Sequence, residues 1–236
     1  MMETQNECKY CKANGVGNFC GSCGRPYKSD RLSLGSILHE VFHFFTHLDH
    51  GFPFTFKRLL TSPGNMQREY IEGVRSKYQK PFSMFFICAT IAALAIYWIN
   101  LLLIKHFDAG DNKEAIFFNK YWVLFQVLMV PFFALITYLI FRQAKYNYGE
   151  ILVFQLYLFS FLFIVLLLIH LLKFVFPHLQ TRYIELPVIV VYTAITNLNF
   201  FKGLKKWVII VLTILSICLC FGLASYLQDL LVKSFT

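Results

Sequence analysis

The chain has 236 residues, of which 57% are hydrophobic, 18% are aromatic and only 15% are charged. Soluble domains usually carry about 25% charged residues, so this composition excludes an ordinary soluble domain. The formal net charge of +9 arises from 22 basic and 13 acidic residues. We attribute this excess to membrane topology and to attraction for anionic lipid, and we expect no nucleic-acid partner.

Four cysteines lie near the N-terminus, in the sequence CKYCKANGVGNFCGSCG. Cys8-x2-Cys11 is followed there by Cys20-x2-Cys23. Two such pairs are typical of a tetrahedral four-thiolate zinc site, because each short turn brings two sulfur atoms to one ion. The spacing predicts one structural zinc ion, bound by all four cysteines, in a zinc ribbon at residues 1–30.

Two other chemistries could explain the same cysteines. A pair of disulfides conflicts with the reducing cytoplasm in which we place the N-terminus. A rubredoxin-like iron site stays open. Residues 1–31 contain five basic and three acidic residues, without a basic stripe. This favours protein docking or a purely structural role for the ribbon over nucleic-acid binding.

Residues 31–80 are predicted to form amphipathic juxtamembrane helices on the inner membrane face. The first, at about 33–48, gathers its apolar side chains within one arc at 100° per residue. The second, at about 53–61, is followed by a Ser-Pro pair suited to cap and open a third helix. The third keeps apolar residues at i, i+4 spacing as far as Tyr78.

Basic residues are concentrated along this third helix, just before the first membrane span. Such residues attract anionic lipid headgroups by about 1 kcal/mol each. We therefore expect lipid headgroup contacts at Arg68, Arg75, Lys77 and Lys80.

The first juxtamembrane helix carries a histidine-rich face opposite its apolar arc. That face gathers His39, Glu40, His43, His47 and His50. His39-Glu40-x-x-His43 matches the pattern with which zinc proteases place two imidazoles and a general base on one helix. A protease needs a third ligand, however, and Glu69 or Glu72 could supply it only if the third helix folds back. We favour a polar or partner-contacting surface, with a second metal site, a pH-sensing site or a protease centre as alternatives.

Long apolar runs follow Pro81, and a hydrocarbon core about 30 Å thick needs roughly 20 apolar residues per helix. Five spans are predicted, at about 82–104, 121–141, 151–173, 183–201 and 207–227. The fourth is the weakest because Glu185 and Pro187 lie near its start, so four spans plus a re-entrant or surface segment is an alternative. The predicted fold is an all-α membrane protein, with a five-helix transmembrane domain at 81–236.

The loops predict the orientation of this domain. Loops 142–149 and 200–206 carry an excess of Lys and Arg, whereas loop 105–120 balances its charges. By the positive-inside rule, the N-terminus is cytoplasmic and the C-terminus lies on the opposite side of the membrane.

Several short motifs within residues 51–78 occur in a fixed order after the ribbon. They read Gly-Phe-x-x-Thr, then Pro-Gly, then Tyr-x-x-Gly-x-Arg-x-x-Tyr, and the chain then enters its first apolar run. In this combination the chain resembles the bacterial family called domain of unknown function 3667, over roughly residues 8–85. The resemblance implies a membrane protein with a cytoplasmic zinc ribbon, and it implies no reaction. Since the family is bacterial, we expect the chain in a bacterial inner membrane, with its C-terminus in the periplasm.

The best hypothesis is a non-enzymatic inner-membrane protein. Its ribbon and juxtamembrane helices would form a docking platform for a cytoplasmic protein partner or for anionic lipid. The alternatives are a membrane-embedded zinc metalloprotease that uses His39, Glu40 and His43, and a small lipid or solute transporter. A protease requires a third metal ligand, and a transporter requires a polar cavity in the membrane.

Overall fold

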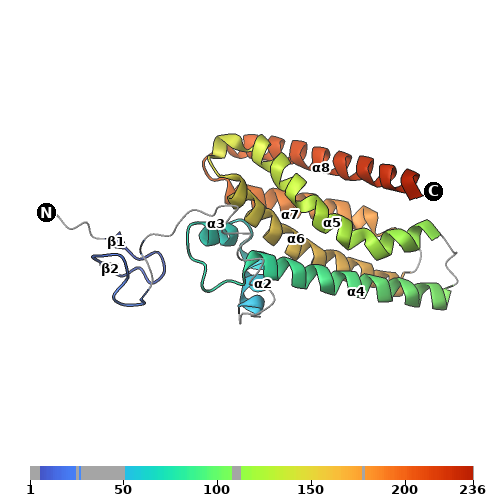
Figure 1. Cartoon of the computed structure of the whole chain (residues 1–236), viewed down its shortest axis with the longest axis horizontal. Coiled ribbons are helices and arrows are strands. Elements are labelled where there is room, and N and C mark those ends of the chain that lie inside the picture. The colour runs from blue at the N-terminus through green and yellow to red at the C-terminus, as the bar shows by residue number, and fades with distance from the viewer. Residues whose placement is uncertain (1–5, 25–26, 28–50, 108–112, 177–178, 236) are drawn as a thin grey trace.

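The computed structural model describes the chain except for a few segments drawn as grey traces in Figure 1. These segments are residues 1–5, 25–26, 28–50, 108–112, 177–178 and 236. The predicted helix at 33–48, with its histidine face, lies outside the described residues.

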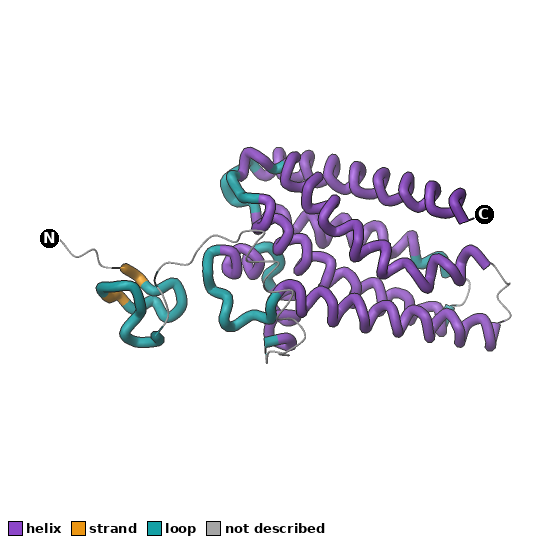
Figure 2. The backbone as a smooth tube through the Cα atoms, in the orientation of Figure 1, coloured by secondary structure: helices purple, strands orange, loops and turns teal. Residues whose placement is uncertain are grey.

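Five long helices run side by side and alternate in direction (Figures 1 and 2). They are α4 (Pro81–Phe107), α5 (Lys113–Ile140), α6 (Tyr148–Leu171), α7 (Arg182–Phe200) and α8 (Lys206–Phe235). Short 3-10 turns follow two of them, η2 (Arg142–Ala144) after α5 and η3 (Leu172–Phe174) after α6. The helical fold class is confirmed.

Four of these helices, namely α4, α6, α7 and α8, have the length and apolar composition of membrane spans. The part of α5 whose side chains are described contributes a shorter apolar stretch, Phe125–Ile140. These helices are those of a multi-pass membrane protein. The segment with the weakest prediction, α7, is one continuous helix despite Pro187.

The central helix of the bundle is α6. It contacts α4, α5 and α7, and it is the most buried of the candidate spans. Its sequence explains this position, because apolar residues cover every face, and such a helix is stable only when it is surrounded. A capping box starts the helix: Asn147 Oδ1 accepts the Glu150 backbone N–H at 2.8 Å, and Glu150 Oε2 accepts the Asn147 N–H at 2.9 Å.

Two short helices lie at one end of this bundle (Figure 1). They are α2 (Phe52–Thr61) and α3 (Asn65–Ile71), and with the loop that follows them they form what we call the collar, residues 51–80. Leu59 and Met66 are fully buried, and both helices contact α6. The collar therefore packs on protein at these residues, whereas Phe54 and Leu60 of α2 are exposed.

The third juxtamembrane helix is shorter than predicted. It begins at Asn65, after Gly64 and not at the Ser-Pro pair, and it ends at Ile71. Gly73 adopts φ +112°, outside the helical region, so the i, i+4 pattern that continues to Tyr78 runs through a loop. The apolar spacing alone could not predict that the helix ends shortly before this glycine.

Beyond the collar lies the small N-terminal ribbon, residues 6–24 together with Tyr27 (Figure 1). It contains two two-residue strands, β1 (Asn6–Glu7) and β2 (Asn14–Gly15), paired antiparallel. So short a hairpin cannot be stable through its own hydrogen bonds.

Candidate metal centre and its collar

Four sulfur atoms converge within the ribbon. The Sγ atoms of Cys8, Cys11, Cys20 and Cys23 all lie within 4.8 Å of one another. The Cys8–Cys23 separation is 3.6 Å and the Cys11–Cys20 separation is 3.5 Å. A tetrahedral ion about 2.3 Å from each sulfur would place the sulfurs about 3.8 Å apart. The four predicted residues therefore form a cluster that fits one metal ion, and no disulfide joins them.

The two cysteine pairs have the same backbone geometry. In the first turn the N–H of Lys12 donates to the carbonyl of Cys8 at 2.8 Å, and in the second the N–H of Gly24 donates to Cys20 at 2.7 Å. Lys12 has φ +63° and Gly24 has φ +68°. Each turn thus ends on a left-handed residue directly after its second cysteine, which directs both sulfurs of the pair to the same point.

The second turn also favours the thiolate form that binds metals. The backbone N–H of Ser22, assisted by that of Cys23, lowers the pKa of the Cys20 thiol to about 6, against the opposing effect of desolvation. Backbone amides directed at a sulfur stabilise its negative charge. The turn is therefore suited to a thiolate ligand before any ion arrives.

A small core supports the cluster from one side. Tyr27 is buried among Cys8 and Cys20, and its N–H donates to the carbonyl of Asn18 at 3.0 Å. Its hydroxyl lies where a Cβ on Gly15 would be. Only glycine leaves room at the end of β2 for this aromatic ring.

The ribbon is held on the collar by its first cysteine turn. Lys9 Nζ donates to the backbone carbonyl of Glu72 at 2.8 Å, and Ser76 Oγ donates to the Tyr10 hydroxyl at 2.6 Å. Lys77 Nζ lies 5.0 Å from the centre of the Tyr10 ring. The two residues between Cys8 and Cys11 therefore bind the loop that follows α3, so metal binding and docking involve the same turn.

The carboxylate of Glu69, at the centre of the collar, is paired with an arginine. Glu69 accepts hydrogen bonds from Arg58 Nη2 at 2.8 Å and from the Tyr78 hydroxyl at 2.6 Å. Burial, followed by the bond to Glu69, raises the pKa of Tyr78 to about 12. Residues far apart in the sequence, on α2, α3 and the loop, are thereby joined around one charged group.

Backbone contacts join the start of α2 to the entry of α4. The Gln79 N–H donates to Thr55 Oγ1 at 2.8 Å, and the Tyr157 hydroxyl donates to the Gln79 carbonyl at 2.5 Å. A Cβ on Gly51 would lie 2.9 Å from the Gln79 nitrogen. The Gly-Phe-x-x-Thr motif thus serves a close crossing of two chain segments.

The Pro-Gly motif serves a similar joint with α7. Gly64 has φ +81°, and a Cβ there would meet the Thr196 carbonyl and the Phe200 nitrogen. Asn199 Nδ2 donates to the Pro63 carbonyl at 3.0 Å. The loop between α2 and α3 is therefore locked onto the end of α7.

Three of the four basic residues predicted at lipid headgroups make contacts within the protein. Arg68 donates to the Asn199 carbonyl at 3.1 Å and pairs with Glu72 at 3.5 Å, and Arg75 donates to the Tyr70 carbonyl at 3.4 Å. The third, Lys77, is the residue placed over Tyr10. Lipid contact at Arg68, Arg75, Lys77 and Lys80 stays a prediction.

His39, Glu40, His43, His47 and His50 lie outside the described residues. The two carboxylates considered as a third metal ligand, however, are described. Glu69 is bound by Arg58 and Tyr78, and Glu72 by Arg68. Either would have to leave its cationic partner to bind a metal ion at the histidines.

Sequence reasoning missed the docking role of Lys9 and Tyr10 and the joint at Asn199. The TNLN sequence that contains Asn199 was a signal, because polar residues at the end of an apolar helix need partners.

The collar lies within the segment of the chain that matches a known protein family. Residues 49–93, which cover the collar and the first half of α4, match the family described as "Protein of unknown function (DUF3667)". The resemblance predicted from the motifs is confirmed over this segment. No curated protein and no solved structure matches the chain.

Proposed function

From a collar that carries the DUF3667 signature, we propose that the chain is a membrane-anchored docking protein without catalytic activity. Its ribbon binds one structural zinc ion and presents an apolar turn to a protein partner. The collar holds the ribbon at the membrane surface. The membrane is the inner membrane of a bacterium, and the ribbon lies on its cytoplasmic side.

The observation that carries this proposal is an exposed pair of apolar side chains on the ribbon. Phe19 is 66% exposed and Val16 is 50% exposed, on the segment between β2 and the second cysteine turn. An aromatic side chain held rigidly in solvent has little entropy to lose on binding, and such residues often dominate the energy of interfaces. The turn therefore has the properties of a binding anchor.

The bound metal ion makes the turn rigid. A chain this short has too small a core to fold without a staple, and a four-thiolate ion supplies one. The first cysteine turn is occupied by the collar, through Lys9 and Tyr10. Among the described ribbon residues, Val16 and Phe19 are then the large apolar side chains that face solvent.

The alternative of a zinc protease gains no support from the described residues. Its proposed third ligands, Glu69 and Glu72, are each bound to an arginine at the collar. A protein partner also explains the ribbon better than anionic lipid does, because Lys9 is directed to the collar and an apolar turn gains nothing from headgroups.

The test is photocrosslinking in cells from a photoreactive amino acid placed at position 19, with position 12 as the control. Lys12 is equally part of the ribbon and exposed, but it is charged. We expect one discrete crosslinked protein from position 19 and none from position 12. Metal analysis of the purified chain should find one zinc ion.

A second pair of variants links the docking to the metal. Cys20→Ser should remove the zinc and abolish the crosslink, whereas Cys88→Ser, at a buried cysteine of α4, should leave both intact. A crosslink that survives loss of the metal, or equal crosslinking from both positions, would contradict the docking function. A purified chain that contains iron or no metal would contradict the zinc assignment.

A further inference from the structure

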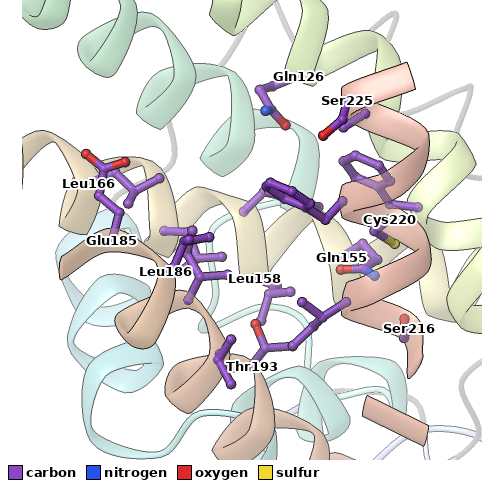
Figure 3. A pocket seen from close by; sticks show the side chains of 18 of the residues that line it. Gln126, Gln155, Leu158, Leu166, Glu185, Leu186, Thr193, Ser216, Cys220 and Ser225 are labelled. Carbon is purple, nitrogen blue, oxygen red and sulfur yellow. The ribbon is translucent and has the colours of Figure 1, made fainter. Parts of the chain in front are cut away.

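A cavity of about 420 Å³ lies among α5, α6, α7 and α8. This volume is within the range of about 300–1,000 Å³ that small-ligand sites occupy. Three leucines of one α6 face form an apolar wall, at Leu158, Leu162 and Leu166. Figure 3 shows side chains of α7 and α8 that point toward this wall, among them Leu186 and Cys220.

Polar side chains also line the cavity, which is unusual for space surrounded by lipid-spanning helices. Gln155 is 5% exposed; its Nε2 donates to Thr137 Oγ1 at 2.7 Å, and Thr137 lies 3.4 Å from Ser216 Oγ. Within the described residues, the Gln155 Oε1 atom has no hydrogen-bond partner. Hydrogen bonds of this kind join neighbouring membrane helices, so they fix the positions of α5, α6 and α8 around the cavity.

One end of the cavity is charged. Glu185 and Arg182 line this end, and His170 Nδ1 lies 3.2 Å from Glu185 Oε1. Arg182 begins α7, with its guanidinium 5.6 Å from the centre of the Phe221 ring, and it makes no ion pair within the described part of the chain. Because Glu185 contacts His170 and Arg182 has no such carboxylate partner among the described residues, Arg182 can accept an anion at this end.

The cavity opens between the helices toward the surroundings of the bundle. Leu186 and Val190 are each 38% exposed and Phe221 is 46% exposed, although all three line it. Along α7 the lining runs from Arg182 to Thr193. These residues are eleven positions apart, which corresponds to about 17 Å at about 1.5 Å per residue. Half of a bilayer core about 30 Å thick is about 15 Å, so the cavity is as long as one leaflet.

We propose that this cavity binds one acyl chain of an anionic phospholipid. The acyl chain lies along Leu158, Leu162 and Leu166, and the phosphate lies beside Arg182. The length, the apolar wall and the cationic end are together complementary to a lipid whose headgroup remains at the membrane surface remote from the collar. The site shares no residue with the ribbon, so it can be tested apart from the docking function.

The first test measures whether a lipid chain enters the cavity of the full-length protein, and whether a bulky side chain placed there excludes it. The chain is reconstituted in phosphatidylglycerol vesicles that contain a phospholipid with a photoreactive group near its acyl terminus, and labelled peptides are identified by mass spectrometry. Labelling should concentrate on α7 and α8 residues that line the cavity. Ala224→Trp should reduce it at least about fivefold, the lower limit expected from overpacking.

Gly222→Trp is the matched control, because Gly222 lies on the same helix, lines no part of the cavity and has open space beside it. Leu186→Trp, from the opposite wall, repeats the test should Ala224→Trp fail to fold. If the folded tryptophan variants at positions 224 or 186 are labelled as strongly as Gly222→Trp, the lipid is merely annular and the proposal is wrong.

The second test concerns the headgroup. Competition with unlabelled phosphatidylglycerol should displace the probe more strongly than competition with phosphatidylcholine. Arg182→Gln should reduce this preference by about fivefold, which corresponds to one cationic contact at the membrane surface. Lys105→Gln, an exposed charge on α4 outside the cavity, should leave the preference unchanged. An unaltered preference in Arg182→Gln would overturn the assignment of the phosphate position.

Discussion

Gly15 and Tyr27 illustrate how single residues determine the geometry of the metal centre. Because a Cβ at Gly15 would overlap the Tyr27 hydroxyl, Gly15→Ala should displace the ring that supports Cys8 and Cys20. Overpacking of this kind costs about 1–3 kcal/mol. We expect faster loss of metal to a chelator, measured by a colorimetric zinc indicator.

Gly21→Ala is the control for this prediction. Gly21 belongs to the same ribbon, but a Cβ there would meet nothing within 4 Å. Equal rates of metal loss from Gly15→Ala and Gly21→Ala would show that Tyr27 does not support the cluster.

The four ligands could be predicted at this scale because cysteine pairs at x2 spacing have few other uses. The residues around them could not. A lysine at φ +63° is uncommon, and nothing in its sequence position distinguishes Lys12 from any solvent-facing lysine. The contact between Tyr10 and Ser76 joins residues 66 positions apart, which local patterns do not encode.

Among the elements, the joint between α3 and α7 depends on Gly64. Gly64→Ala would introduce a Cβ at a left-handed residue, which costs about 1–2 kcal/mol. It would also press against the Thr196 carbonyl. We expect a clear loss of thermal stability in detergent, measured by the loss of monodisperse protein on heating. Gly203→Ala, where the new atom meets nothing, should behave like the original protein.

The collar should also respond to pH through Tyr78. A tyrosine in the unfolded chain ionises near pH 10, whereas Tyr78 in the folded chain keeps its proton until about pH 12. Between these values the folded state binds more protons, so its stability falls as pH rises. The stabilisation from Tyr78 is therefore complete below pH 10 and is lost between pH 10 and 12.

Tyr78→Phe isolates this effect. The difference in midpoint of thermal unfolding between the original protein and Tyr78→Phe should be large at pH 8 and smaller at pH 11. A difference that stays constant with pH would mean that burial and the bond to Glu69 do not raise the pKa of Tyr78.

Apolar runs were sufficient to predict the long helices, since each run is bounded by charged or glycine-containing loops. They were insufficient for the collar. There Leu59, Met66 and Tyr70 are apolar because they pack on α6 and α7, a pattern indistinguishable in sequence from that of a helix on a membrane surface. The cavity likewise depends on which faces of α7 and α8 meet α6, which composition does not specify.

At the scale of the whole molecule, the charged loops agree with the arrangement of the helices. Tyr146, after η2, stacks on Phe200 at the end of α7, with ring centres 4.6 Å apart. The turn between α5 and α6, with Arg142 and Lys145, and the turn between α7 and α8, with three lysines, therefore lie at the collar end of the bundle. The positive-inside rule would place this end, with the ribbon, in the cytoplasm.

The number of crossings follows from this arrangement and can be tested directly. The five helices alternate in direction, and the C-terminal end of α8 lies at the end of the bundle remote from the collar (Figure 1). Even α7, the shortest at 19 residues, is about 28 Å long at about 1.5 Å per residue, close to the thickness of the hydrocarbon core.

A reporter that is active only in the periplasm should therefore be active when fused after Thr236 and silent when fused after Gln143. If both fusions are silent while a cytoplasmic reporter is active at both sites, α7 does not cross the membrane, and the protein has four spans. The proposed lipid cavity would then lack the wall that α7 contributes, so this measurement constrains the topology and the site together.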